Sequence, residues 1–286
     1  MREYRRKERY SHKPAEASSG GGVCNNRPVL DFKIHEGNPD FVLSLARGLL
    51  VVEAFQGHPG GLTVGDVAAS TGLSRASARR LLITLEMLGY ASHSGSVYRL
   101  SSRVLRLGFS FLSSNSLPAM ALPILEEISD ALHESSSIST LVDDEIVYLA
   151  RSVTKRVMSV GLSVGSRLPA YCTSMGRVLL AALSKAELTA YLSRVELKAY
   201  TPKTIKSKKR LVAELDQVRK QGYALVDEEL ELGLRSIAVP VIASTGRVVA
   251  AMNTGVHASR VTTTDMVNKM LPVLLESAQR LSYSLG

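Results

Sequence analysis

Side chains able to do covalent or metal chemistry are sparse and scattered in this sequence. The six histidines stand singly at positions 12, 35, 58, 93, 133 and 257, and the two cysteines, Cys24 and Cys172, are too few for a thiolate zinc site or a disulfide framework. The P-loop, GxGxxG and HExxH patterns do not occur. Cys172 near Ser174 could act as a nucleophile, but no neighbouring residue supplies the base that it would need. The sequence therefore predicts no catalytic residue, metal site or cofactor.

Basic and hydroxyl side chains give a clearer chemical signal. Arginines and serines crowd the short segment Ser74–Arg80, and the whole chain has 35 Lys+Arg against 26 Asp+Glu, a formal net charge of +9. Guanidinium groups bind phosphate oxygens, while serine and arginine also bond to base edges. A solvated helix face is the alternative for each arginine taken alone. The cluster as a whole favours a nucleic-acid contact.

Three short helices and a hairpin are expected to carry this basic segment. The first spans about 41–55, with Val42, Leu45, Leu49 and Val52 as its buried stripe; the second spans about 64–70, capped by Thr63 with Asp66. Ser74 caps a third helix whose inward stripe comprises Ala78, Leu81, Leu82, Leu85 and Leu88. Residues 90–100 alternate around a turn-forming cluster, as in a hairpin or wing.

This order of elements is typical of a winged helix-turn-helix, in which the third helix enters the major groove. The residues expected to touch DNA are Ser74, Arg75, Ser77, Arg79, Arg80, Thr84 and Arg99.

Composition and periodicity divide the chain into four parts. Residues 1–38 form a basic, Gly/Ser-rich tail, 39–100 the winged helix-turn-helix, 101–116 a linker helix and 117–286 a second domain. The linker carries Val104, Leu105, Leu107, Phe109, Phe111 and Leu112 around much of its circumference. Such a helix must be covered on more than one side, which favours contact with a second copy of the chain over an internal core helix.

The second domain mixes helices and strands. Helices are expected at about 119–134, 174–183, 185–192, 207–221 and 263–284, and strands at about 137–143, 145–151, 156–161, 223–227, 235–242 and 247–253. Strands joined by hairpins, with helices before and after them, predict an α+β fold with an antiparallel sheet.

Several polar residues in this domain stand where they could face a pocket. The turn Ser166–Gly176 leads into a helix whose N-terminal N–H groups could receive a carboxylate. Ser236 begins an apolar strand, and Asn253 ends another. A satisfied strand-end or capping role is the alternative for each of them.

Across residues 41–286 the chain resembles the IclR family of bacterial transcriptional regulators. The similarity is carried by the winged helix-turn-helix, by Gly165–Pro169 through Gly176–Ala181, and by the run Gly222–Pro240. Segments Arg167–Arg177 and Leu73–Arg80 look most like the regulators of protocatechuate and β-ketoadipate catabolism.

The resemblance implies a GAF-like effector-binding domain, homodimers that can pair into tetramers, and a small organic-acid effector similar to β-ketoadipate or protocatechuate. It places the effector pocket at Ser174, Met175, Val226, Ser236, Asn253 and Gly255. Val226 stands where members that bind very small keto acids carry Asp, and Ser236 where Cys is frequent. The loss of that carboxylate suits a longer or aromatic acid.

These observations predict a cytoplasmic, effector-responsive regulator that binds promoter DNA and controls aromatic-compound catabolism, with no membrane partner. Two other interpretations stay open at this point. One is a small-organic-acid hydrolase or lyase that retains a DNA-binding domain, which turnover of candidate acids would reveal. The other is a ligand sensor that acts through a protein partner and not through DNA, which would fail to bind a promoter.

Overall fold

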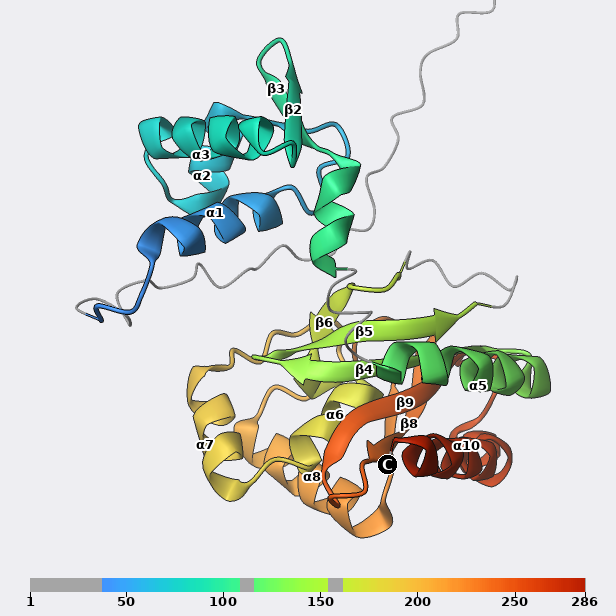
Figure 1. The fold of residues 1–286 in the computed structure, drawn as a ribbon. Helices are drawn as coiled ribbons and strands as arrows, with labels where there is room; N and C mark the ends of the chain where they lie inside the picture. Colours follow the sequence, from blue (N-terminus) through green and yellow to red (C-terminus); the bar gives the residue numbers. More distant parts are fainter. Residues whose placement is uncertain (1–37, 109–115, 154–161, 286) are drawn as a thin grey trace, which may run out of the picture. The chain divides into compact units, whose positions relative to one another are not determined.

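The structure, a computed structural model, describes residues 38–108, 116–153 and 162–285. The chain divides into two compact units, Met1–Leu107 and Gly108–Gly286 (Figure 1). The expected tail lies almost entirely outside the described residues. No helix within the described ranges is long and apolar enough to cross a membrane.

The first unit consists of three helices and a small sheet. The helices are α1 (Leu43–Ala54), α2 (Val64–Thr71) and α3 (Arg75–Met87). The strands β1 (Leu62–Thr63), β2 (Ala91–Ser94) and β3 (Val97–Leu100) pair antiparallel in the order β1-β3-β2. This is the predicted winged helix-turn-helix, with β2 and β3 as the hairpin.

Local hydrogen bonds set the ends of α2 and α3 as the sequence predicts. The Thr63 hydroxyl accepts from the Asp66 N–H, and the Asp66 carboxylate accepts from the Thr63 N–H, which completes a capping box. Gly72 ends α2 in the left-handed region, at φ 70°, where a residue without Cβ is favoured. Ser74 then caps α3 by accepting from the Ser77 N–H. The turn between the two helices is therefore bounded by the left-handed Gly72 and by the Ser74 cap.

The predicted inward stripe of the first helix is wrong. Val42, Leu45 and Leu49 are 59%, 62% and 49% exposed, and the helix instead buries Leu50, Val51 and Ala54 in the core of the unit. Both sets repeat at three- or four-residue steps, so periodicity alone cannot choose between them. The outward set, Val42, Leu43, Leu45 and Leu49, is called the α1 apolar face below.

The linker helix is only partly described. A 3₁₀ turn, Ser102–Val104, follows the hairpin, and α-helical backbone continues through residues 105–108. Leu105 and Leu107 are 74% and 49% exposed. Phe109, Phe111 and Leu112 lie outside the described residues, so the expected linker contact stays a prediction.

The second unit contains a six-stranded antiparallel sheet. Its strands in spatial order are β6 (Arg167–Pro169), β5 (Glu145–Ser152), β4 (Ser135–Val142), β9 (Val248–His257), β8 (Leu234–Ile242) and β7 (Ala224–Asp227). The α+β prediction is thereby confirmed. β6 lies within the expected turn and is too short to show a two-residue period, while the strand expected at 156–161 lies outside the described residues.

Helices cover both faces of this sheet (Figure 1). On one face, α5 (Ser116–Leu132) and α10 (Leu271–Ser284) enclose a core that includes Ile237 and Met252. On the other, α6 (Ser174–Ala181), α7 (Lys185–Arg194) and α8 (Lys208–Gln221) enclose a second core. The expected closing helix is divided into α9 (Thr263–Asp265), a π-helical turn (Met266–Met270) and α10.

Candidate ligand cavity and nucleic-acid interface

The basic segment is exposed on the first unit. Ser74, Arg75, Arg79, Arg80, Thr84 and Arg99 are exposed, and Ser77 is half-buried. Arg75 and Arg79 also line an open groove of about 620 Å³ between α3 and the hairpin, opposite His93 and Ser96. The fold thus brings the start of α3 and the hairpin to the same surface.

The arginines and the hydroxyl groups on this surface differ in their hydrogen-bond partners. The Ser74 hydroxyl is used in the α3 cap, and the Thr84 hydroxyl donates to the Arg80 carbonyl at 2.8 Å. Within the described ranges, Arg75, Arg79, Arg80 and Arg99 form no ion pair with a carboxylate. The four guanidinium groups are therefore available to bind phosphate.

The hairpin is attached to α3 through His93. Its Nδ1 lies 2.6 Å from Glu86 Oε1, and its ring packs against Tyr98, with the two centroids 5.3 Å apart. The sequence pattern did not predict this contact of His93. The contact fixes where the hairpin stands beside the basic segment.

The second unit contains a cavity of about 80 Å³ between the sheet and the turn before α6. A water molecule needs only about 10–15 Å³ on this measure, so the space suits a small organic molecule. The six residues that the resemblance implied for the effector, Ser174, Met175, Val226, Ser236, Asn253 and Gly255, all line it.

Strand register explains why residues far apart in sequence meet here. Ser135 pairs with Gly255, Gly255 with Ser236, and Ser236 with Val226, so one row crosses β4, β9, β8 and β7. Directly paired residues present their side chains on the same face of a sheet. Asn253 is two residues from Gly255 and therefore lies on that face too.

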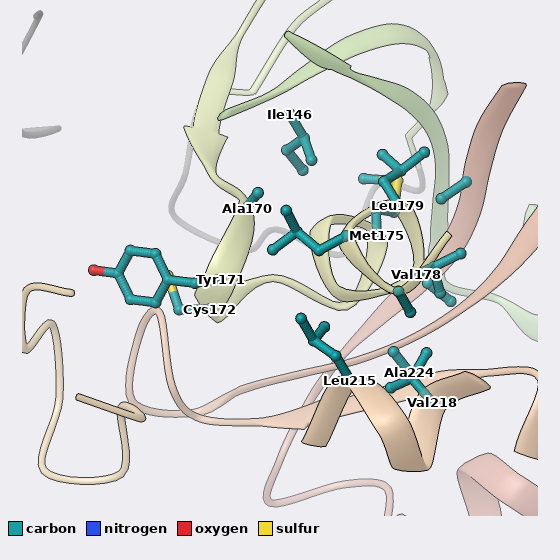
Figure 2. Packing of buried hydrophobic residues seen from close by; sticks show 14 of the residues in the cluster. Ile146, Ala170, Tyr171, Cys172, Met175, Val178, Leu179, Leu215, Val218 and Ala224 are labelled. Carbon is teal, nitrogen blue, oxygen red and sulfur yellow. The ribbon is translucent and has the colours of Figure 1, made fainter. Parts of the chain in front are cut away.

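The turn before α6 closes the other side of the cavity. Thr173 caps α6 by accepting from the Gly176 N–H at 3.2 Å, and its own hydroxyl donates to the Pro169 carbonyl at 3.1 Å. A Cβ on Gly176 would lie 2.1 Å from the Ala170 carbonyl oxygen, so only glycine allows this close approach. Figure 2 shows Met175 and Cys172 in this packed region, and both line the cavity.

Three polar atoms at the cavity wall are buried without a hydrogen-bond partner. They are Ser174 Oγ, Asn253 Oδ1 and Arg151 Nε. Ser174 is 1% exposed and Asn253 9% exposed. A buried polar atom without a partner is costly, and native structures satisfy most of them. Unpartnered polar atoms on residues that line a cavity favour a ligand with polar groups of its own.

The larger polar residues of the wall that sequence reasoning missed are Arg151, Tyr148 and Glu134. Burial raises the pKa of the Tyr148 hydroxyl to about 12, which keeps it protonated and able to donate. Glu134 is paired with Arg260 at 2.8 Å. The available signal was an arginine at the end of the otherwise apolar strand around Leu149.

The arrangement offers no support for catalysis. Burial raises the pKa of the Cys172 thiol to about 12, the opposite of what a nucleophile requires. Gly161-Leu-Ser-Val-Gly165 has the GxSxG spacing of a nucleophile elbow. Ser163 is exposed, in a turn that leads to β6 and not to a helix, and its hydroxyl lies 3.4 Å from that of Ser166. Among the described residues no group of acidic, histidine and cysteine side chains could hold a metal ion.

Comparison with known proteins covers both units. The IclR helix-turn-helix domain model matches residues 44–95, and the model of the bacterial transcriptional regulator IclR C-terminal domain matches residues 109–283. The chain is 46% identical over 274 residues to the Pca regulon regulatory protein of Pseudomonas putida, covering 96% of this chain and 94% of that protein.

Two further relatives cover one or both units. The p-hydroxybenzoate hydroxylase transcriptional activator of Acinetobacter baylyi is 38% identical over 247 residues, 85% of this chain and 91% of that protein. A double mutant of the PobR transcription factor inducer-binding domain from Acinetobacter, solved with 3-hydroxybenzoic acid, is 35% identical with a TM-score of 0.55 and covers 58% of this chain and 97% of that one.

The winged helix-turn-helix, the antiparallel sheet with its cavity and these matches agree, and the chain belongs to the IclR family of bacterial transcriptional regulators, not to a family of enzymes.

Proposed function

We propose that this protein is an effector-responsive, DNA-binding regulator of genes for aromatic-compound catabolism in the protocatechuate and β-ketoadipate pathway. The observation that carries the effector proposal is the cavity with its unpartnered polar atoms. The two relatives named for the Pca regulon and for p-hydroxybenzoate hydroxylase support the choice of pathway. The protein would act in the cytoplasm, where promoter DNA is accessible.

For the domains, we propose that residues 39–100 bind DNA, 101–116 connect, and 117–286 bind the effector. In the first part, Arg75, Arg79, Arg80 and Arg99 would hold phosphates and fix the register on the duplex. Ser77 and the exposed start of α3 would face base edges. Ser74 and Thr84 would contribute mainly by shaping the helix, since their hydroxyls already have backbone partners.

For the effector, we propose a small organic acid similar to protocatechuate or β-ketoadipate, bound in the cavity. Ser174, Met175, Val226, Ser236, Asn253 and Gly255 would form its contacts. Val226 is 4% exposed and gives the wall an apolar surface where a ring or carbon chain can pack. The complex of the PobR domain with a hydroxybenzoic acid supports this class of ligand.

For the oligomer, we propose a homodimer that can pair into a tetramer, with a second copy of the chain covering apolar surface of the first unit. The α1 apolar face is largely exposed, as are Leu105 and Leu107 at the start of the linker helix. Apolar surface of this kind on a soluble domain favours a protein contact. Two copies would present two α3 helices to two operator half-sites.

Regulation requires that the effector bind one arrangement of the DNA-binding domains more tightly than another, because equal affinity for both shifts nothing. Promoter binding by the purified full chain, measured by fluorescence anisotropy with and without protocatechuate, 4-hydroxybenzoate and β-ketoadipate, tests the proposal. We expect specific promoter binding and a change in promoter affinity with at least one acid. Absence of promoter binding by folded protein, or turnover of an acid, would overturn it.

A further inference from the structure

Strand register sets a polar row across the cavity wall. Arg151 of β5 pairs with Ser137 of β4, and Ser137 pairs with Asn253 of β9. Paired residues share a face, so Arg151 and Asn253 lie on the cavity face with a single strand between them. Adjacent strands are about 4.8 Å apart, which separates the two backbones by about 10 Å.

Arg151 supplies the positive charge at this wall. Among the described residues that line the cavity, Arg151 and Glu134 alone are charged, and Glu134 is neutralised by Arg260. Arg151 Nη1 donates to the Leu162 carbonyl at 3.2 Å, which orients the guanidinium, while its buried Nε has no partner. A fixed guanidinium with a free donor matches a carboxylate.

The wall also presents polar atoms that carry no charge. Ser174 Oγ and Asn253 Oδ1 are both buried and unpartnered. Apolar side chains also line the cavity, among them Leu168 and Met175. The cavity wall therefore combines one unpaired cation, apolar surface and uncharged polar atoms.

We propose that Arg151 holds the carboxylate of the effector, while Ser174 and Asn253 bind a second polar group at its other end. This assignment rests on the proposed function and deepens it. It differs from the expectation that the carboxylate sits at the start of α6. At the start of α6 the Gly176 N–H already donates to the Thr173 hydroxyl, whereas Arg151 carries a full positive charge.

Both candidate effectors are acids of the same kind. Each carries a carboxylate at one end and a second polar group at the other end of a ring or a short carbon chain. A hydroxybenzoate would place a hydroxyl at Ser174 and Asn253, and its proton would satisfy Asn253 Oδ1. A keto-dicarboxylate would place its second carboxylate there, where it would accept from the Ser174 hydroxyl.

The first test changes the charge of ligand and protein together. Calorimetry compares 3,4-dihydroxybenzoate with its neutral amide, and β-ketoadipate in parallel, on the full chain and on Arg151→Gln. Because a hydrogen bond to a charged group is worth about tenfold to a hundredfold in affinity, we expect wild type to prefer the acid by at least about tenfold. In Arg151→Gln the preference should fall to about threefold or less.

Two further variants keep this test decisive. Arg151→Lys retains the charge and should retain part of the preference. Arg280→Gln on α10 is the matched control, since Arg280 is paired with Glu127 and does not line the cavity; its preference should equal that of wild type. Should Arg151→Gln not fold, Arg151→Lys decides: a reduced preference for the acid supports the anchor, and an unchanged preference contradicts it.

The second test examines the uncharged polar atoms of the wall with Ser174→Ala, which removes a buried hydroxyl that has no partner and should leave the fold intact. If the effector is a hydroxybenzoate, this variant narrows the affinity gap between 4-hydroxybenzoate and benzoate. If it is a dicarboxylate, the variant weakens β-ketoadipate and leaves benzoate unchanged. Either result supports the assignment and shows whether the effector is a hydroxybenzoate or a dicarboxylate.

The results distinguish a failure of the Arg151 assignment from a failure of the effector proposal. If wild type binds acid and amide equally, or if Arg151→Gln keeps the full preference, Arg151 is not the carboxylate anchor, although the regulator proposal stands. If wild type binds none of the acids, the effector part of the proposed function fails as well, and the anchor falls with it.

Discussion

Arg177 Nη2 donates to Glu229 Oε2 at 2.6 Å, and both residues are buried, at 1% and 8% exposure. Arg177 lies on α6, and Glu229 lies in the loop after β7. Each group has further partners: Arg177 Nε donates to the Tyr171 carbonyl, and the Ile205 N–H donates to Glu229. The pair therefore joins the turn before α6 to the loop that carries Leu230, so two parts of the cavity wall are held together.

Breaking this pair should destabilise the second unit. Arg177→Met leaves Glu229 buried without its partner, and we expect a loss of about 3–5 kcal/mol in the free energy of unfolding. The double variant Arg177→Met/Glu229→Leu removes both charges and should recover much of the loss. Urea unfolding of all three proteins measures this; additive losses in the double variant would contradict the coupling. Arg280→Met, at an exposed pair, is the control and should lose much less.

Arg79 and Arg80 should each contribute to DNA binding through phosphate charge. Replacing both by Ala should weaken promoter binding and reduce the slope of log K against log salt by about 0.9 for each phosphate that the protein no longer neutralises. Anisotropy titrations at several salt concentrations give the slope. Lys220→Ala, on the exposed surface of α8, removes a charge elsewhere and should leave the slope unchanged. An unaltered slope in the Arg79/Arg80 variant would place the DNA elsewhere.

Val226 should contribute to the affinity of the cavity for the effector by packing against its apolar part. Val226→Asp adds a carboxylate at a position that is 4% exposed, so the acid that binds best should lose at least about tenfold in affinity through repulsion and poorer packing. Val226→Asn has a similar size without the charge and should lose less. Calorimetry compares the two, and promoter affinity without effector should stay near wild type. Unchanged affinity in both Val226→Asp and Ser236→Ala would mean that the pocket lies elsewhere.

The α1 apolar face should contribute to the contact between subunits. Leu45 is 62% exposed, so Leu45→Glu should not disturb the fold, yet it would bury a carboxylate in the proposed interface. We expect a lower mass in solution and weaker promoter binding, measured by light scattering and anisotropy. Ala69→Glu, on an exposed part of α2, is the matched control. A Leu45→Glu protein of wild-type mass would exclude this face as the interface. Phe111→Glu should act in the same way through the linker helix.

Features set by neighbouring residues could be predicted from the sequence. The caps at Thr63 and Ser74 depend on groups three residues away, and both were confirmed. The antiparallel sheet followed from hairpins between consecutive strands such as β8 and β9. These signals are short in range, so a single sequence contains them.

Features set by distant contacts could not be predicted in the same way. The inward face of α1 is set by its packing against α2 and α3. Leu45 and Val51 both follow good helical spacings, so the sequence alone does not choose between them. Arg151 looks like an ordinary charge at the end of a strand. Its place in the cavity depends on pairing with Ser137 and on the bulge between Ile138 and Ser139, neither of which the sequence pattern reveals. The six effector residues came from family resemblance, and their role remains a prediction.

The row Ser135, Gly255, Ser236 and Val226 has a consequence for how such a regulator acquires new responses. Each strand contributes one small side chain, and backbone hydrogen bonds hold the strands together whatever those side chains are. Single substitutions in this row would resize the chamber while the backbone hydrogen bonds of the sheet stay in place. The row is therefore the natural place to randomise when building a genetically encoded biosensor for a different acid.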